Sequence, residues 1–128
     1  MNTTKEEIEN YLTDIKNAIQ NNQYRIERNS RRQDNLNLFV DYVIDEEKAK
    51  EILLDLAVDD FSAILKNGHV GYGHERLYVF DKDVELLERV GDANKEVSLY
   101  IKFNKLDNFY VIVVSLHEQK YPIQYYFK

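Results

Sequence analysis

The sequence contains no cysteine and only one proline, Pro122. Without cysteine the chain can form neither a disulfide framework nor a thiolate metal site, and this composition suits the reducing cytoplasm, where we expect the protein to act. Internal repeats, low-complexity tracts and a linker between two domains are also missing. A hydrophobic content of 44% can fill one core at this length, so we expect a single domain over residues 1–128.

The chain also lacks the long apolar runs of membrane proteins. It has no stretch of 18 uncharged apolar residues, and residues 1–7 contain neither a basic start nor an apolar segment of the secretory type. We therefore expect no export signal and no membrane span.

Positive charge is scarce overall but unevenly distributed. The sequence has 17 lysines and arginines and 23 acidic residues, and the formal net charge of −6 argues against a protein that coats nucleic acid. Seven acids fall within residues 45–60, whereas residues 97–128 hold four lysines and two acids. The last quarter of the chain is therefore locally basic, although ordinary solvated surface charge would give the same pattern.

Two amphipathic segments predict helices in the first half of the chain. A capping-box pattern begins at Thr4, and apolar residues then recur at helical spacing, which predicts a helix over about 4–22. Acids at the start of a second apolar stripe predict a helix over about 45–57.

The segments between these helices are less regular. Residues 24–28 alternate apolar with charged side chains, as in a short strand. Residues 29–37 are polar and turn-like, with Arg31 and Arg32 in a mobile or binding loop, and residues 38–44 fit either a strand or the start of a helix.

The second half of the chain changes to the period of two that indicates strands. A loop over 66–74 holds three of the four glycines, and the alternation then appears in 76–80, in 97–103 and in 109–116. The acidic run 81–88 is typical of a solvated turn region. Helices followed by a small antiparallel sheet predict an α+β fold.

The last two strands predict a hairpin, because Asp107-Asn108 suits a two-residue turn. That turn sets a register in which an apolar face is uninterrupted. The predicted pairs on this face are Leu99 with Leu116, Ile101 with Val114 and Phe103 with Ile112.

The opposite face of this hairpin carries the side chains best suited to binding or catalysis, namely Tyr100, Lys102 and His117. In the predicted register Lys102 opposes Val113, and Tyr100 is a diagonal neighbour of His117, within reach of large side chains. A phenol, an ammonium and an imidazole would then share one sheet face, although the solvent face of an edge hairpin often has this composition.

These strands resemble a known family. Residues 96–103, EVSLYIKF, and residues 111–122, VIVVSLHEQKYP, are similar to the C-terminal hairpin of MqsR-type toxins. The resemblance extends back through 76–80 to 52–61 and covers about two thirds of the chain. Such toxins are RelE-like ribonucleases of bacterial toxin-antitoxin systems, which cut mRNA without a metal and are neutralised by an antitoxin. The resemblance thus implies a RelE-like core over about 24–128, preceded by an extra helix over about 4–22.

The resemblance also implies a set of site residues, with no cofactor and no metal. The family's strand tyrosine falls on Tyr100 and its terminal basic residue on His117. Lys102 and Arg76 would hold phosphate charge, and His117 is a natural proton acceptor or donor near neutral pH. The residues expected to contact single-stranded RNA are Glu75, Lys120, Arg31 and Arg32.

One departure from the family concerns a lysine. Where the family has lysine after an aspartate-aromatic pair, this chain reads Asp60-Phe61-Ser62-Ala63. The missing lysine and the acidic net charge favour an alternative, a non-catalytic relative that binds a macromolecule through the acidic 45–60 helix, for example a phage-encoded inhibitor. Two weaker alternatives are a domain with no link to nucleic acid and a metal site at His69 and His74, with Glu75 or Glu118 as a further ligand.

Overall fold

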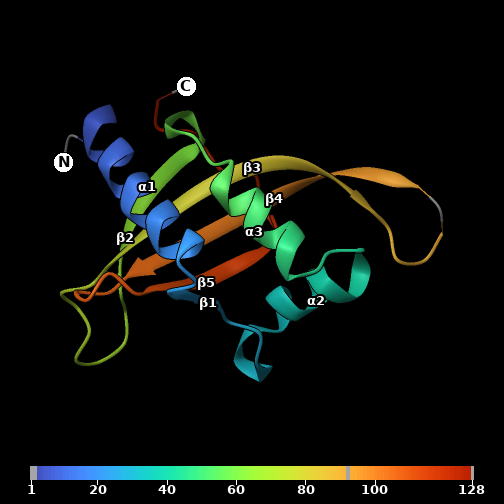
Figure 1. Ribbon diagram of the computed structural model, residues 1–128, viewed down its shortest axis with the longest axis horizontal. Coiled ribbons are helices and arrows are strands. Elements are labelled where there is room, and N and C mark those ends of the chain that lie inside the picture. The colour runs from blue at the N-terminus through green and yellow to red at the C-terminus, as the bar shows by residue number, and fades with distance from the viewer. Residues whose placement is uncertain (1–2, 92, 128) are drawn as a thin grey trace.

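The computed structural model describes residues 3–91 and 93–127, which form an α+β fold. Its elements in chain order are α1 (Lys5–Gln20), β1 (Tyr24–Ile26), the 3-10 helix η1 (Ser30–Arg32), α2 (Gln33–Asp41), α3 (Glu46–Leu54), the 3-10 helix η2 (Val58–Asp60), β2 (Phe61–Lys66), β3 (Arg76–Leu87), β4 (Asn94–Lys105) and β5 (Val111–Glu118). Figure 1 shows α1 and α3 lying over the same face of the sheet. The expected packing of helices on a small sheet is confirmed.

Helix α1 begins where the sequence predicts it. The Thr4 side chain accepts a hydrogen bond of 3.1 Å from the Glu7 N–H, which satisfies one of the amides that lack a partner inside the helix. Ile8, Ile15 and Ile19 share one side of the helix and are fully buried. The predicted helix over 4–22 is confirmed, and its apolar side forms part of the core.

Helix α3 follows the same rules. The Asp45 carboxylate accepts a hydrogen bond of 2.8 Å from the Lys48 N–H, and Ala49, Ile52 and Leu53 are buried. The helix ends at Leu54, three residues before its predicted end. Within the described part of the chain, no helix combines the length and apolar character that crossing a bilayer requires.

The sheet has five strands in the order β1-β5-β4-β3-β2. Neighbouring strands are antiparallel except β1, which runs parallel to β5 and pairs Tyr24 with Val111. The sheet is therefore mixed, which corrects the expectation of a purely antiparallel one. Only the first three residues of the predicted strand over 24–28 belong to β1.

The two faces of the sheet differ in what covers them. One face packs against α1 and α3, and its residues Phe80, Ile101 and Phe103 are fully buried. The other face, called the far face below, carries the alternate residues of the same strands. Its members include Val79 and Asp81 of β3, Tyr100 and Lys102 of β4, and Ser115 and His117 of β5.

Residues 33–41 form α2, so the predicted loop over 29–37 is wrong beyond Arg32. The local signal is weak because the first turn is polar and Arg32 provides no side-chain cap. Tertiary contacts supply the stability instead, since Asn35 and Leu38 are almost completely buried. The ambiguous segment 38–44 begins as the end of this helix.

The predicted turn over the acidic run 81–88 is also wrong, because β3 continues to Leu87. Asp83 and Glu85 alternate with Val84 and Leu86, and all four pair with β4. The acidic residues Asp81, Asp83 and Glu85 lie on one face only, so the alternation is compatible with a strand even though the composition is turn-like. The edge strand β2 was not anticipated by the sequence.

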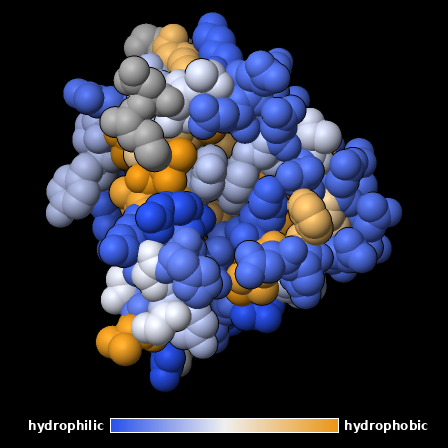
Figure 2. Space-filling model, turned by 90° about the vertical axis from the view of Figure 1, so that its left-hand side faces the viewer, coloured by the Kyte–Doolittle hydropathy of each residue, from blue (hydrophilic) through white to orange (hydrophobic). Residues whose placement is uncertain are grey.

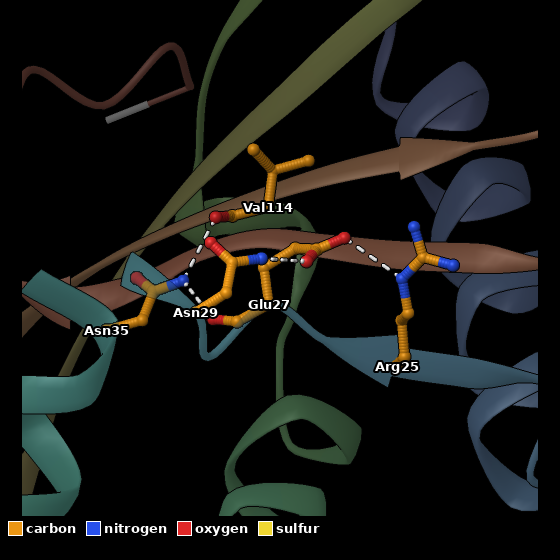
Figure 3. A network of polar contacts seen from close by, with 5 residues as sticks. All are labelled: Arg25, Glu27, Asn29, Asn35 and Val114. Atoms are coloured by element: carbon orange, nitrogen blue, oxygen red, sulfur yellow. Dashed lines mark hydrogen bonds and ion pairs between the residues drawn. The ribbon is translucent and has the colours of Figure 1, made fainter. Parts of the chain in front are cut away.

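Asn35 joins α2 to the edge of β5, just beyond the point where β1 ends. Its amide nitrogen donates to the Glu27 carbonyl at 2.8 Å and to the Val114 carbonyl at 3.0 Å, as Figure 3 shows. Its amide oxygen accepts the Leu116 N–H at 2.9 Å. One side chain therefore takes the place of a neighbouring strand and satisfies backbone groups that would otherwise be unpaired.

The β4–β5 hairpin forms, but its turn and register differ from the prediction. The Leu106 N–H donates to the Tyr110 carbonyl, and Phe109 adopts a positive φ of 67°. This makes a loop of three residues rather than two, the known alternative for hairpins. The pairs are Leu99 with Glu118, Ile101 with Leu116 and Phe103 with Val113.

An irregularity in β5 restores the predicted faces farther along the hairpin. The longer loop moves the register by one residue, which turns Val113 toward the helices in place of Ile112. An extra residue at Val114 then moves the register by one more, so that Leu116 returns to the buried face. Burial of Leu99 and Ile101 under the helices is confirmed.

Candidate functional site

The far face brings together Tyr100, Lys102 and His117, as the sequence predicts. Tyr100 pairs directly with His117 across the two strands, rather than diagonally, and Lys102 pairs with Ser115 rather than Val113. The Tyr100 and His117 rings stack with their centroids 5.3 Å apart and an interplanar angle of 17°. The corrected register thus places the phenol and the imidazole closer than expected.

The imidazole of His117 is oriented by its own backbone neighbour. Its Nδ1 lies 2.8 Å from the Glu118 carbonyl oxygen. Because a carbonyl can only accept, Nδ1 carries the proton in this contact, and in the neutral ring Nε2 is left as the acceptor. The ring is partly exposed, so Nε2 can serve as a base toward a bound molecule.

Lys102 and Tyr100 are both half-buried, and burial acts on them in opposite directions. Burial, together with the nearby charge of Arg32, lowers the pKa of the Lys102 ammonium. Burial raises the pKa of the Tyr100 phenol, which therefore keeps its proton. The Lys102 Nζ lies 6.0 Å from the centroid of the Tyr100 ring. The site thus combines an ammonium of increased acidity with a neutral hydroxyl.

The positive charges near this site are not neutralised by acids. In the part of the chain that the structure describes, Arg31, Arg32 and Lys102 form no ion pair, whereas Arg25 and Lys105 each hold a carboxylate within 2.9 Å. Unpaired cations on one face of an acidic protein favour binding of an anion.

Arg31 and Arg32 reach this site from η1, immediately before α2. Together with Asp34, Ser115 and His117 they line a pocket of about 180 Å³ between α2 and β5. The arginines predicted to lie in a binding loop therefore lie beside His117, although 85 residues separate Arg32 from it in the sequence.

Lys120 and Glu75 lie at the margins of the far face. Lys120 is paired with Asp34 at 2.8 Å, at the rim of the pocket. Glu75 accepts hydrogen bonds of 2.9 Å from Asn67 and from Asn104. Asn104 follows Lys102 by two residues on the same face, so Glu75 fixes the surroundings of the site from the loop side.

Arg76 is not brought to the far face. It lies on the same side of β3 as Tyr78, in a separate pocket with Tyr11 and Lys105, and donates to the Gly73 carbonyl at 2.9 Å. Arg76 therefore cannot share a phosphate with Lys102.

Figure 2 looks at the end of the molecule that carries the 67–75 loop and the β4–β5 turn, where most of the surface is hydrophilic.

Sequence reasoning missed Asp81, which the register adds to the far face, whereas Ser115 lies on this face as predicted but pairs with Lys102 rather than with Tyr100. Asp81 pairs with Tyr100 and is buried, and it accepts a hydrogen bond from Gln119, which also donates to the Leu99 carbonyl at 3.2 Å. Recognising Asp81 required the true length of β3, and pairing Ser115 with Lys102 required the irregularity at Val114. Simple alternation reveals neither.

Ala63, where the family has a lysine, lies in the same row of laterally paired residues across the sheet as Lys102. Ala63 pairs with Val79, Val79 with Lys102 and Lys102 with Ser115. The alanine thus points to the far face two strands away, and Lys102 provides an ammonium farther along the same row.

The two histidines of the 66–74 loop do not form a metal site with their suggested partners. Glu75 is engaged by two asparagines, and Glu118 accepts a hydrogen bond of 2.8 Å from Tyr42 near the other end of β5. No cluster of three or more potential carboxylate or imidazole ligands occurs in residues 3–91 and 93–127.

No family model matches the chain, and comparison with curated proteins and solved structures finds no significant match. The fold of the described residues defines the class, an α+β fold with three α-helices and a five-stranded mixed sheet. Function must therefore be inferred from the geometry of the far face.

Proposed function

We propose that this protein is a metal-independent endoribonuclease toxin that cuts mRNA and is neutralised by a cognate antitoxin covering the far face. The observation that carries the proposal is the meeting of stacked Tyr100 and His117 with the unpaired cation Lys102 on one sheet face, next to the unpaired Arg32 of η1. Stacked rings can position a base of single-stranded RNA, and unpaired cations attract its phosphates.

The reaction needs one proton acceptor and one proton donor. The His117 Nε2 takes the proton of the 2′-hydroxyl, whose oxygen attacks the adjacent phosphorus. The bond from phosphorus to the 5′-oxygen then breaks, leaving a 2′,3′-cyclic phosphate and a 5′-hydroxyl. The Lys102 ammonium stabilises the developing charge and gives a proton to the departing oxygen, a role favoured by its lowered pKa.

Tyr100 acts beside these two groups. Its pKa is raised by burial, so the hydroxyl stays protonated and can donate a hydrogen bond to the phosphate. The lysine absent at Ala63 is compensated by Lys102, which lies in the same row of the sheet.

Incubation of the purified protein with mRNA, with and without ribosomes and in the presence of EDTA, tests the proposal. We expect cleavage in EDTA that His117→Ala strongly reduces, and growth arrest on expression that the same substitution relieves. If folded wild-type protein neither cuts RNA under any of these conditions nor slows growth, the enzyme proposal is wrong.

A non-catalytic inhibitor is the second candidate, favoured by one observation. Glu47 and Glu51 are exposed on α3, which lies on the other side of the sheet from the unpaired cations. A protein that uses this acidic helix would bind a basic macromolecule. Substitution of both glutamates by glutamine would then abolish binding to that partner. The same double substitution would leave a ribonuclease activity of the far face unchanged.

A further inference from the structure

The pocket between α2 and β5 has features that the cleavage step does not use. It is lined by Arg31, Arg32 and Asp34 on one side and by Ser115 and His117 on the other, whereas Tyr100 and Lys102 lie outside it. Its volume of about 180 Å³ is below the roughly 300–1,000 Å³ of pockets for drug-sized ligands. It can therefore admit a small group but not a whole nucleotide.

Ser115 supplies an independent sign of a ligand. The residue is only 3% exposed, yet its hydroxyl makes no hydrogen bond to any described residue. The residue is part of the pocket lining, and its hydroxyl is not among the fully buried side-chain atoms, so what remains of its exposed surface opens into the pocket. Its position on the pocket wall makes it available to an acceptor atom inside.

The charge of the pocket indicates the chemistry of that ligand. Arg31 and Arg32 have no carboxylate partner in the described chain, and the one acid of the lining, Asp34, is already paired with Lys120 at 2.8 Å. The side chains that line the pocket therefore carry a net positive charge. The guanidinium groups and the hydroxyl are donors that suit a tetrahedral oxyanion.

We infer that this pocket binds a backbone phosphate of RNA next to the phosphate that is cleaved. The inference rests on the proposed ribonuclease function, because the ligand is part of that substrate. His117 borders both places, so an RNA strand that leaves the Tyr100 and Lys102 side passes directly into the pocket. The pocket then contributes to binding and register rather than to bond breaking.

Steady-state cleavage of a labelled single-stranded RNA oligonucleotide tests this role. Arg31→Ala and Ser115→Ala should each raise KM, the arginine change by on the order of tenfold, with a smaller effect on kcat. Arg31 is exposed, so its removal does not endanger the fold. Arg25→Ala is the matched control, because Arg25 is exposed and paired with Glu27; it should leave both constants unchanged.

Titration with inorganic phosphate, followed by NMR of the backbone amides, separates failure of the pocket from failure of the enzyme. Shifts at residues 33–35 and Ser115 that disappear in the Arg31→Ala, Arg32→Ala double variant support the pocket, even if no RNA is cut. Absence of those shifts, or cleavage by Arg31→Ala and Ser115→Ala with wild-type KM, overturns the inference while leaving the ribonuclease proposal intact.

Discussion

Tyr100 and His117 stand directly opposite each other on β4 and β5, and their rings stack at 5.3 Å. The stack fixes the imidazole plane, and the Glu118 carbonyl fixes which nitrogen carries the proton. These two contacts leave His117 oriented before any substrate binds, which is the condition for efficient proton transfer.

Removal of the imidazole should stop the proposed reaction. We expect His117→Ala to lower the cleavage rate by on the order of 10²–10⁴, the range for losing one general acid or base. Gel-based cleavage assays at saturating RNA measure the effect. His74→Ala, in the distant 66–74 loop, should have wild-type activity, and an equal loss in both variants would contradict the assignment.

Tyr100 can be dissected into its hydroxyl and its ring. Tyr100→Phe keeps the stack on His117 and removes the hydrogen-bond donor, whereas Tyr100→Ala removes both. If the ring mainly positions a base, the phenylalanine variant should retain most of the activity and the alanine variant should lose binding by about 1–3 kcal/mol. Equal losses in cleavage would show instead that the hydroxyl acts on the phosphate.

Lys102 should show two separable roles. Its pKa is lowered by burial and by Arg32, so it loses its proton, and RNA affinity declines, at a lower pH than for an ordinary lysine. Lys102→Arg stays charged and should bind RNA even at alkaline pH, yet cleave poorly because arginine does not release a proton. Lys102→Ala should reduce the salt dependence of RNA affinity by the amount expected for the loss of about one phosphate contact.

Fluorescence anisotropy with a 2′-O-methyl RNA, which cannot be cut by the proposed reaction, measures the affinity of the Lys102 variants over pH and salt. Affinity of the wild type that stays constant through the alkaline range would contradict the role of the Lys102 charge.

Asn35 should be important for stability rather than chemistry. Asn35→Ala leaves the Val114 carbonyl and the Leu116 N–H without partners, and each unsatisfied buried group costs about 1–3 kcal/mol. We expect the free energy of unfolding in urea to fall by about 3 kcal/mol. Asn37→Ala, on the exposed side of α2, should change it by less than about 0.5 kcal/mol. Similar values for both would contradict this role.

Asp81 should make stability depend on pH in the acidic range. Burial, reinforced by the charges of Asp83 and Asp60, raises its pKa, so the folded state favours the protonated carboxyl. The stabilisation is complete below the unfolded value of about 3.9 and is lost as pH rises through the higher folded value.

Asp81→Asn, which cannot titrate, supplies the comparison. Its unfolding free energy relative to wild type should therefore increase with rising pH across that window and then level off. Urea unfolding at a series of pH values measures this difference, and a constant difference would show that the folded and unfolded pKa values of Asp81 are equal.

Local patterns in the sequence determined the helices α1 and α3 and the side of the sheet on which Tyr100 and Lys102 lie. Capping residues such as Thr4 and Asp45 act on amides three residues away, and alternation along one strand follows from backbone geometry alone. No distant contact is needed for either.

Only the tertiary structure decided which strand residues face one another and which cations meet them. The positive φ of Phe109 and the extra residue at Val114 set the pairing of Tyr100 with His117, and alternation does not encode register. Helix α2 depends on the contact of Asn35 with β5, about 80 residues away in the chain, and this contact brings Arg32 to His117. The pairing of β3 with β4 also places Arg76 and Lys102 on opposite faces of the sheet, because Lys102 pairs with Val79 and Arg76 lies three residues before Val79. The sequence alone does not reveal this pairing.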